Sequence, residues 1–288
     1  MEENNILVKD LCKKFPGFSL DQVSFRVPKG RIVGFIGENG AGKSTTIHLI
    51  LNERKKDSGE IRIFGADHTA CSLKEEIGVV FDKCNFHDVF TAENINRMLS
   101  GIYRTWDSSL FHKYLNQFGL PKDQPIGSLS KGMQMKLTII SALAHKPKLL
   151  ILDEATSGLD PVARNEILDL FLEFIQDEEH SILFSSHITS DIQKVADYVV
   201  LIHQGRIILE EQKDDLIDQY GILKCTKNTF ASIDPQDYLI HRSTKVSEEC
   251  LVRDREAVRH KYKDVVVDHA ALEDILLFYV KGDIPCED

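Results

Sequence analysis

Residues 37–44 have the types and spacing that bind phosphate esters. They read Gly-Glu-Asn-Gly-Ala-Gly-Lys-Ser and satisfy the pattern Gly-x-x-x-x-Gly-Lys-Ser. Glycines let a backbone wrap closely around phosphate oxygens, so that successive N–H groups and a helix N-terminus face the anion. In this pattern Lys43 reaches the β- and γ-phosphates, and the Ser44 hydroxyl holds Mg²⁺. The alternative is a glycine-rich turn between a strand and a helix, with no ligand.

A second segment supplies the carboxylates that phosphoryl chemistry needs. Four apolar residues, 149–152, lead directly into Asp153 and Glu154. Ligands of open α/β sheets bind at the carboxyl ends of the strands. Asp153 can hold the Mg²⁺ shell there, while Glu154 orients and polarises a water on the γ-phosphate. The alternative is a strand that leaves the core into an acidic loop.

The elements around these segments predict an α/β fold with parallel strands. Ile32–Ile36 is a continuous apolar run, typical of a buried central strand, and it enters the glycine-rich loop directly. Residues 45–51 read as the helix that follows, and a strand over 181–184 ends in Ser-Ser-His. Strands that alternate with helices indicate a parallel sheet. Further strands are expected at 6–8, 23–27, 61–64, 78–81, 148–152, 198–202, 206–209, 250–252 and 265–267, and helices at 108–118, 162–176, 190–196 and 271–280.

Three more motifs occur in order, and together with the first two they resemble one family. Residues 129–134 read Leu-Ser-Lys-Gly-Met-Gln, residues 157–160 read Ser-Gly-Leu-Asp, and His187 stands at a strand end. Phe15 lies upstream of the phosphate loop. Residues 1–220 therefore resemble the nucleotide-binding subunits of ABC transporters, and the Ser-Lys-Gly-Met form resembles the branch that serves ABC-2 type permeases.

The resemblance implies a P-loop NTPase cassette: a RecA-like core with a β-subdomain, and a helical subdomain over about 82–146. A small α+β extension, 221–288, would follow the cassette of 1–220. ATP and Mg²⁺ are the implied cofactors. The expected catalytic residues are Lys43, Glu154 and His187, and the expected metal ligands are Ser44, Asp82 and Asp153. The expected nucleotide contacts are Phe15, Gly37, Asn39, Gly40, Ala41, Gly42, Lys43, Ser44, Thr45, Ser130, Gly132 and Asp160.

Several of these roles rest on the resemblance and have a simpler alternative. Two cassettes would close head to tail over ATP, with Ser130 and Gly132 facing the γ-phosphate held by the other subunit, whereas Ser130 could merely cap a helix. Asp160 would order the dimer interface more than contact ATP. His187 would hydrogen-bond the γ-phosphate. Phe15 would stack on adenine, with Phe18 as a nearby competitor.

Two positions depart from the family pattern. Asp82 follows the strand predicted at 78–81, where the family has glutamine, so a carboxylate replaces an amide near the γ-phosphate. It would sense Mg²⁺ and couple to the permease, or else face solvent. Lys131 replaces the usual glycine, and its side chain must point away from the closed interface or reach a phosphate.

Composition limits the remaining possibilities. The 288 residues carry a formal net charge of −10, which argues against a nucleic-acid-coating protein. No apolar run approaches the length of a membrane span, and the polar start lacks the features of a signal peptide. Scattered cysteines without a Cys-x-x-Cys pair predict free thiols in a reducing cytosol. We therefore expect a cytoplasmic protein, bound peripherally at the cell membrane through a permease.

The predicted function is ATP hydrolysis that powers a separately encoded integral-membrane permease, with export inferred from the branch. The helical region would carry the permease contact, over Phe86, His87, Phe90 and Trp106, although Trp106 could equally be core. Two other classes compete: a soluble ABC protein acting on ribosomes or DNA, and a cassette with a regulatory or resistance role and no transport. The single cassette, the acidic charge and the lack of a heptad run or cysteine pairs disfavour the first.

Overall fold

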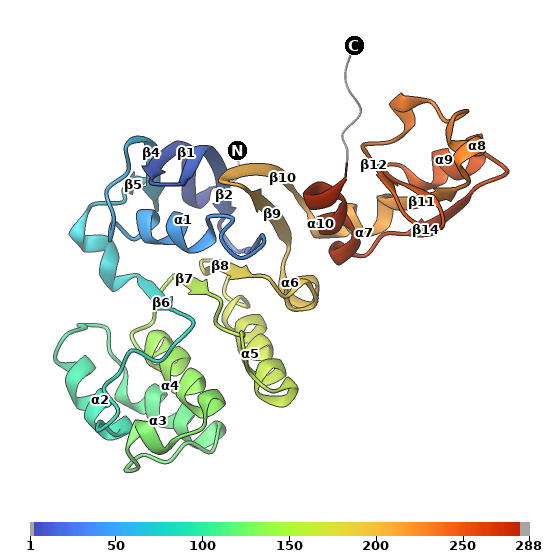
Figure 1. Cartoon of the computed structure of the whole chain (residues 1–288). Helices are drawn as coiled ribbons and strands as arrows, with labels where there is room; N and C mark the ends of the chain where they lie inside the picture. The colour runs from blue at the N-terminus through green and yellow to red at the C-terminus, as the bar shows by residue number, and fades with distance from the viewer. Residues whose placement is uncertain (1–2, 283–288) are drawn as a thin grey trace.

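Three sheets organise residues 3–282, the part of the chain that the computed structural model describes (Figure 1). The first is antiparallel, in the order β2-β1-β4-β5. Its strands are β1 (Asn4–Phe15), β2 (Phe18–Pro28), β4 (Ser58–Ile63) and β5 (Ala66–Asp67). Alternating residues such as Val8 and Val23 are buried against the neighbouring sheet, which gives these strands their period-2 pattern.

The second sheet has the order β10-β9-β3-β8-β7-β6 and forms the centre of the molecule. Its strands are β3 (Ile32–Ile36), β6 (Ile77–Val80), β7 (Leu149–Asp153), β8 (Ser181–Ser186), β9 (Tyr198–His203) and β10 (Arg206–Gln212). All neighbours pair in parallel except β9 and β10. The carboxyl ends of β3, β7 and β8 therefore meet at one edge.

Helices cover both faces of this central sheet, which explains its continuous apolar strands. On one face, side chains of α1 (Lys43–Ile50) join alternate strand residues such as Val33 and Ile151. On the other, α5 (Pro161–Phe174) and α6 (Thr189–Val195) pack over residues such as Leu152 and Phe184. The expected α/β P-loop fold is confirmed.

A helical bundle is inserted between β6 and β7 and lies beside the central sheet (Figure 1). It contains α2 (Ala92–Ser100), α3 (Ser108–Gln117) and α4 (Lys131–Leu143). Trp106 is half-buried in this bundle: its Nε1 donates to Asn96 Oδ1 over 2.9 Å, and its ring lies 5.3 Å from that of Phe111. The structure thus places Trp106 in the core, and of the other proposed contact residues only His87 is exposed.

The third sheet, in the order β12-β13-β11-β14, is antiparallel and forms a separate lobe (Figure 1). Its strands are β11 (Gly221–Cys225), β12 (Ile240–Ser243), β13 (Glu248–Val252) and β14 (Val266–His269). Helices α7 (Lys213–Gln219), α8 (Lys227–Phe230), α9 (Arg255–Lys261) and α10 (Leu272–Lys281) flank it. Short 3-10 turns occur at Cys71–Glu75, Ile126–Ser128 and Pro235–Asp237. The last helix, α10, packs against α6 and β12, so the lobe is anchored to the central core.

No helix within residues 3–282 is both long enough and apolar enough to cross a bilayer. In that same part of the chain Cys12, Cys71, Cys84, Cys225 and Cys250 are free thiols. Cys286 lies outside the described residues.

Candidate active site

The glycine-rich loop connects β3 to α1 and lines an open cavity of about 500 Å³. Gly37 is required by packing, because a Cβ there would lie 2.4 Å from the Ile202 carbonyl oxygen. Gly42 precedes α1 with φ +117°, a conformation that favours glycine, and provides no side-chain cap. The first N–H groups of α1 have no intrahelical partner and are free to bind an anion. The cavity is lined by Gly17, Phe18, Glu38, Asn39, Gly40, Gly42, Lys43, Ser44, Thr45 and Glu154.

Two predicted contacts lie beneath the loop rather than in the cavity. Gly37 and Ala41 are both buried, and neither lines it. The Ala41 carbonyl accepts from Gly205 N over 2.9 Å, which ties the loop to the β9–β10 turn. These residues shape the loop, whereas Ser44 and Thr45 face the space it encloses.

Lys43 is buried at the base of the cavity. Its ammonium donates to the carbonyl oxygens of Gly37 at 2.7 Å and Glu38 at 3.2 Å. It also lies 3.2 Å from Glu154 Oε1. A buried ammonium held by neutral carbonyls and one carboxylate is well placed to exchange these partners for phosphate oxygens.

Glu154 sits at the carboxyl end of β7 in a strained backbone conformation, with φ +54°. Its N–H donates to the Ser185 carbonyl at 3.1 Å and to Ser185 Oγ at 3.2 Å, which holds the conformation in place. Such left-handed residues of ordinary type gather at functional sites. Its Oε1 is buried and accepts no hydrogen bond from any described residue, despite the nearby lysine.

His187, which follows β8, approaches the second oxygen of the same carboxylate. Its Nδ1 lies 2.6 Å from Glu154 Oε2. Because an ionised carboxylate only accepts, Nδ1 carries the proton in this arrangement. The Nε2 atom of the neutral ring is then an acceptor, and it donates to a phosphate only when the ring is a cation or has left Glu154.

Asp153 is buried beside β8, and Ser185 Oγ donates to its Oδ1 over 2.5 Å. No hydrogen bond from another described residue reaches its Oδ2. A free carboxylate oxygen and the Ser44 hydroxyl suit Mg²⁺, which prefers oxygen ligands and keeps several places for water and phosphate. No cluster of three His, Cys, Asp or Glu suited to a metal occurs within residues 3–282.

Comparisons with known proteins show which family has a similar sequence. Residues 20–157 fit the family model described as "ABC transporter". The chain is 37% identical over 219 residues to the bacitracin transport ATP-binding protein BcrA of Bacillus licheniformis, covering 73% of this chain and 71% of that protein. It is 34% identical to the lantibiotic transport ATP-binding protein SrtF of Streptococcus pyogenes, covering 68% and 85%.

This chain belongs to the ABC transporter family. It is an ATP-binding cassette protein and an ATPase, as the sequence predicts. Two solved structures agree with this assignment. The ATP binding subunit of an ABC transporter matches with a TM-score of 0.66 and 29% identity, covering 73% of this chain and 91% of that one. The protein cbiO1 of Clostridium perfringens, part of the ABC transporter complex cbiONQ, matches with a TM-score of 0.64 and 26% identity, covering 75% and 91%.

In this ABC cassette the Leu-Ser-Lys-Gly-Met-Gln segment, 129–134, lies next to the Ser-Gly-Leu-Asp segment, 157–160. Ser130 caps α4 by accepting from Met133 N at 3.2 Å, and Asp160 caps α5 by accepting from the N–H groups of Val162 and Ala163. Hydrogen bonds from backbone N–H groups lower the pKa of Asp160, and the one from Ala163 has the largest effect. A Cβ added to Gly132 would lie 3.7 Å from Asp160 Oδ2. Ser130 and Asp160 are exposed, Gly132 is half-buried between them, and all three lie outside the cassette's own cavity.

Phe15 and Asp82 do not line the phosphate cavity. Phe15 lines a neighbouring cavity of about 600 Å³ with Phe18, and the two rings lie 6.5 Å apart. Phe18 lines both cavities, so the structure keeps it as a competitor for adenine. Asp82 is exposed and does not line the phosphate cavity. Its metal role stays a prediction.

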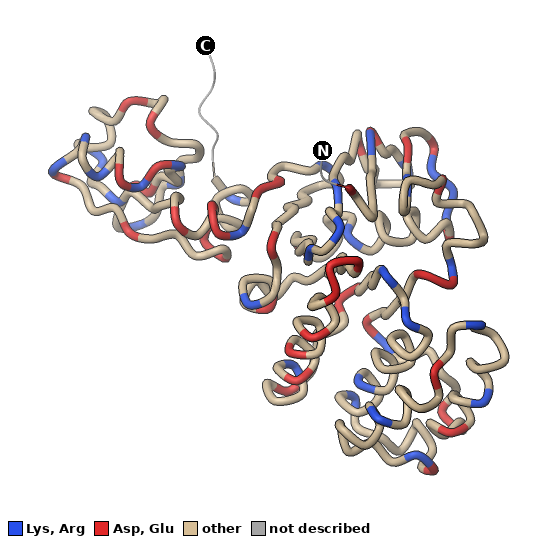
Figure 2. The backbone as a smooth tube through the Cα atoms, turned by 180° about the vertical axis from the view of Figure 1, so that it is seen from behind, with Lys and Arg blue, Asp and Glu red and all other residues tan. Residues whose placement is uncertain are grey.

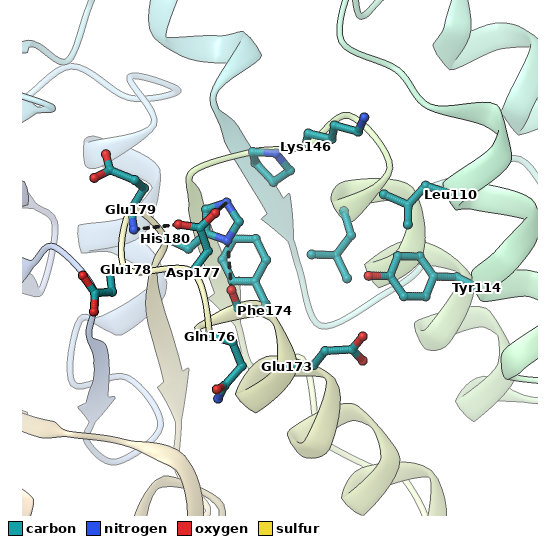
Figure 3. Close-up of a pocket in the computed structure, with 12 residues that line it drawn as sticks. Leu110, Tyr114, Lys146, Glu173, Phe174, Gln176, Asp177, Glu178, Glu179 and His180 are labelled. Carbon is teal, nitrogen blue, oxygen red and sulfur yellow. Dashed lines mark hydrogen bonds and ion pairs between the residues drawn. The ribbon is translucent and has the colours of Figure 1, made fainter.

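A larger groove, of about 860 Å³, lies elsewhere, between α3 and the end of α5 (Figure 3). His180 stacks on Phe174 with centroids 4.3 Å apart and bonds the Phe174 carbonyl through Nδ1. Glu173 of α5 and Asp177, Glu178 and Glu179 after it are the acidic residues that line the groove. Figure 2 shows acidic residues in red along the helix α5. None of the predicted site residues lines this groove, so volume alone does not locate the chemistry.

Sequence reasoning missed Ser185. Its hydroxyl contacts both Asp153 and Glu154, yet only His187, two residues later, was predicted to be a site residue. The available signal was a serine at the carboxyl end of a buried strand.

Proposed function

We propose that this chain hydrolyses Mg·ATP by in-line attack of water on the γ-phosphate, and that it thereby drives a separately encoded membrane permease. The observation that carries the proposal is the chain of contacts Lys43–Glu154–His187 at one rim of the phosphate loop. It joins a cation for the phosphates, a carboxylate for the water and a ring that orients this carboxylate, all at the edge where three strands end.

The carboxylate is held in a resting arrangement that the phosphates would release. The Lys43 ammonium forms an ion pair with Glu154 Oε1 at 3.2 Å, without a hydrogen bond, and phosphate oxygens compete for the same ammonium. Once Lys43 turns to them, Oε1 is free to accept a proton from the attacking water. His187 keeps Oε2 oriented, since its Nδ1 already bonds that atom.

Asp153 and Ser44 would hold the Mg²⁺ ion, which neutralises charge developing on the phosphate oxygens when bound. Lys43 stabilises the same charge from the loop side. The N–H groups at the start of α1 bind the phosphates and add the positive end of the helix dipole. Phe15, with Phe18 beside it, supplies an aromatic face for the adenine.

A second cassette would complete each site. Ser130 and Asp160 are exposed, Gly132 is half-buried beside them, and none of the three lines the cavity of their own chain. Val162, the second residue of α5, is 69% exposed next to them. Burying these residues against the phosphate loop of another copy or a paralogue would bring them to a second nucleotide.

The permease partner is supported by the relatives' transport roles and by exposed apolar side chains. The bacitracin and lantibiotic relatives suggest an exporter that handles peptide antibiotics. Val89 and Ile102, which flank α2, are 68% and 62% exposed. They suit contact with a membrane subunit better than the half-buried Trp106 does. Binding to that subunit would hold the chain on the cytoplasmic face of the membrane.

The substitution Glu154→Gln tests the catalytic part. It removes the base but keeps the shape, so ATPase activity should fall by about 10²–10⁴-fold while ATP binding persists and closed dimers accumulate. Glu173→Gln on the exposed surface of α5 is the matched control and should retain activity. Activity, nucleotide binding and size-exclusion chromatography are measured in parallel. Full activity of Glu154→Gln would refute the assignment.

A further inference from the structure

The Ser185 hydroxyl is the polar group that touches both carboxylate residues at the end of β7. It is fully buried, donates to Asp153 Oδ1 over 2.5 Å and accepts from Glu154 N at 3.2 Å. Register explains the contact, because Ser185 on β8 is the parallel partner of Asp153 on β7. One hydroxyl therefore links an acid's side chain to the backbone of the residue after it.

We propose that Ser185 is a positioning residue: it presents Asp153 to the metal and fixes the strained backbone from which Glu154 reaches the water. This inference rests on the proposed function. The hydroxyl occupies Oδ1 and leaves Oδ2 as the oxygen without a donor, so the carboxylate has one direction in which to act. Groups that orient metal ligands typically change metal affinity or activity by about 10–100-fold when removed.

The second contact bears on Glu154. Its N–H would otherwise rely on the Ser185 carbonyl alone, at 3.1 Å. A residue of ordinary type at φ +54° persists only where its surroundings hold it. Loosening this anchor moves the carboxylate that Lys43 and His187 share, so Ser185 affects the metal and the base together.

Another serine of the same strand separates positioning from mere packing. Ser181 is equally buried, and its hydroxyl also makes two hydrogen bonds, accepting from Asn5 Nδ2 at 2.9 Å and donating to the Pro28 carbonyl at 3.0 Å. It lies at the amino end of β8, away from the phosphate loop. Ser181→Ala therefore removes a buried hydroxyl of similar structural weight that has no contact with Asp153 or Glu154.

The experiment compares Ser185→Ala, Ser185→Thr and Ser181→Ala with the wild-type full chain. Binding of a fluorescent non-hydrolysable ATP analogue is measured while Mg²⁺ is titrated from zero, with thermal unfolding recorded without Mg²⁺. Ser185→Ala should raise the Mg²⁺ concentration for half-maximal binding by about 10-fold or more, with weak binding in EDTA unchanged. It should lower kcat more than it raises KM for ATP. Ser185→Thr keeps the hydroxyl and should recover most of both.

Opposite results are equally clear. A Mg²⁺ midpoint of Ser185→Ala equal to that of the wild type overturns the positioning role, and so does a shift that Ser181→Ala reproduces. Wild-type binding that ignores Mg²⁺ also overturns it. Failure of the wild type to bind the analogue at all would instead refute the proposed function, and the role of Ser185 would fall with it.

Discussion

In each of two regions of this molecule, a serine and a histidine form hydrogen bonds with carboxylates, but the donors are distributed differently. In the third sheet both donors converge on one atom: Ser243 Oγ lies 2.5 Å and His241 Nε2 2.7 Å from Glu248 Oε2. At the phosphate loop the donors are divided, with Ser185 on Asp153 and His187 on Glu154.

The difference lies in the surroundings of each carboxylate. Glu248 is buried, both of these hydrogen bonds end on its Oε2, and it lines none of the cavities described above. Glu154 has a buried oxygen without a hydrogen bond, a lysine beside it and a cavity in front. The same residue types thus stabilise one region and leave the other ready to react, because a buried polar atom without a partner gains from a ligand.

Among the substitutions that compare these two regions, the largest effect should come from Lys43→Ala. The substitution removes the cation that pairs with Glu154 and would meet the phosphates, and one such donor is worth about 10²–10³-fold in kcat. With weaker nucleotide binding added, ATPase activity should fall by about 1,000-fold. Lys29→Ala, which breaks surface ion pairs with Glu3 and Glu179, is the control and should change activity little. If Lys43→Ala retained its ATPase activity, the phosphate loop would not differ from the region around Glu248 in being the reactive one.

The reactive region was the more predictable one because its signals are local. Ile32–Ile36 is the strand that its apolar run predicts, and the loop and helix follow at the expected residues. What could not be predicted depends on neighbouring strands. Register alone brings Ser185 opposite Asp153, and no sequence pattern announces the positive φ of Glu154.

The strands predicted at 250–252 and 265–267 correspond to β13 and β14 of the third sheet, whereas its strand β11 was less predictable because both of its faces are covered. Ile222 of β11 packs with the central core, whereas Leu223 next to it packs in the lobe's own cluster. A strand buried on both sides loses the alternation that reveals strands, and β11 was missed. The helix α10 was predicted, since one face alone is apolar, but its contact with α6 came only from the structure.

Phe278→Ala should have the next largest effect, on stability rather than chemistry. Phe278 is fully buried where α10 meets the central core, and the Arg242 guanidinium lies 4.9 Å from its ring. Loss of a buried aromatic costs about 3–5 kcal/mol in the free energy of unfolding. Denaturant unfolding measures this cost, and ATP affinity of the folded protein should stay within about twofold. Val266→Ala on exposed β14 is the control. A variant that lost ATP affinity while remaining folded would show that the lobe takes part in the reaction.

The smallest effect concerns Glu248 and acid. Hydrogen bonds from Ser243 and then His241 hold the pKa of Glu248 below its usual value of 4.5. Since the folded pKa is the lower one, the ionised carboxylate stabilises the fold above about pH 4.5, and this contribution is lost as the pH falls through the folded pKa. Glu248→Gln lacks the charge, so its melting temperature should lie below that of the wild type at pH 7, and the gap should close towards pH 3. ATPase activity at pH 7 should be unchanged. If the difference in melting temperature stayed constant with pH, the charge of Glu248 would contribute nothing to stability. Glu248 would then differ from Glu154 in geometry alone.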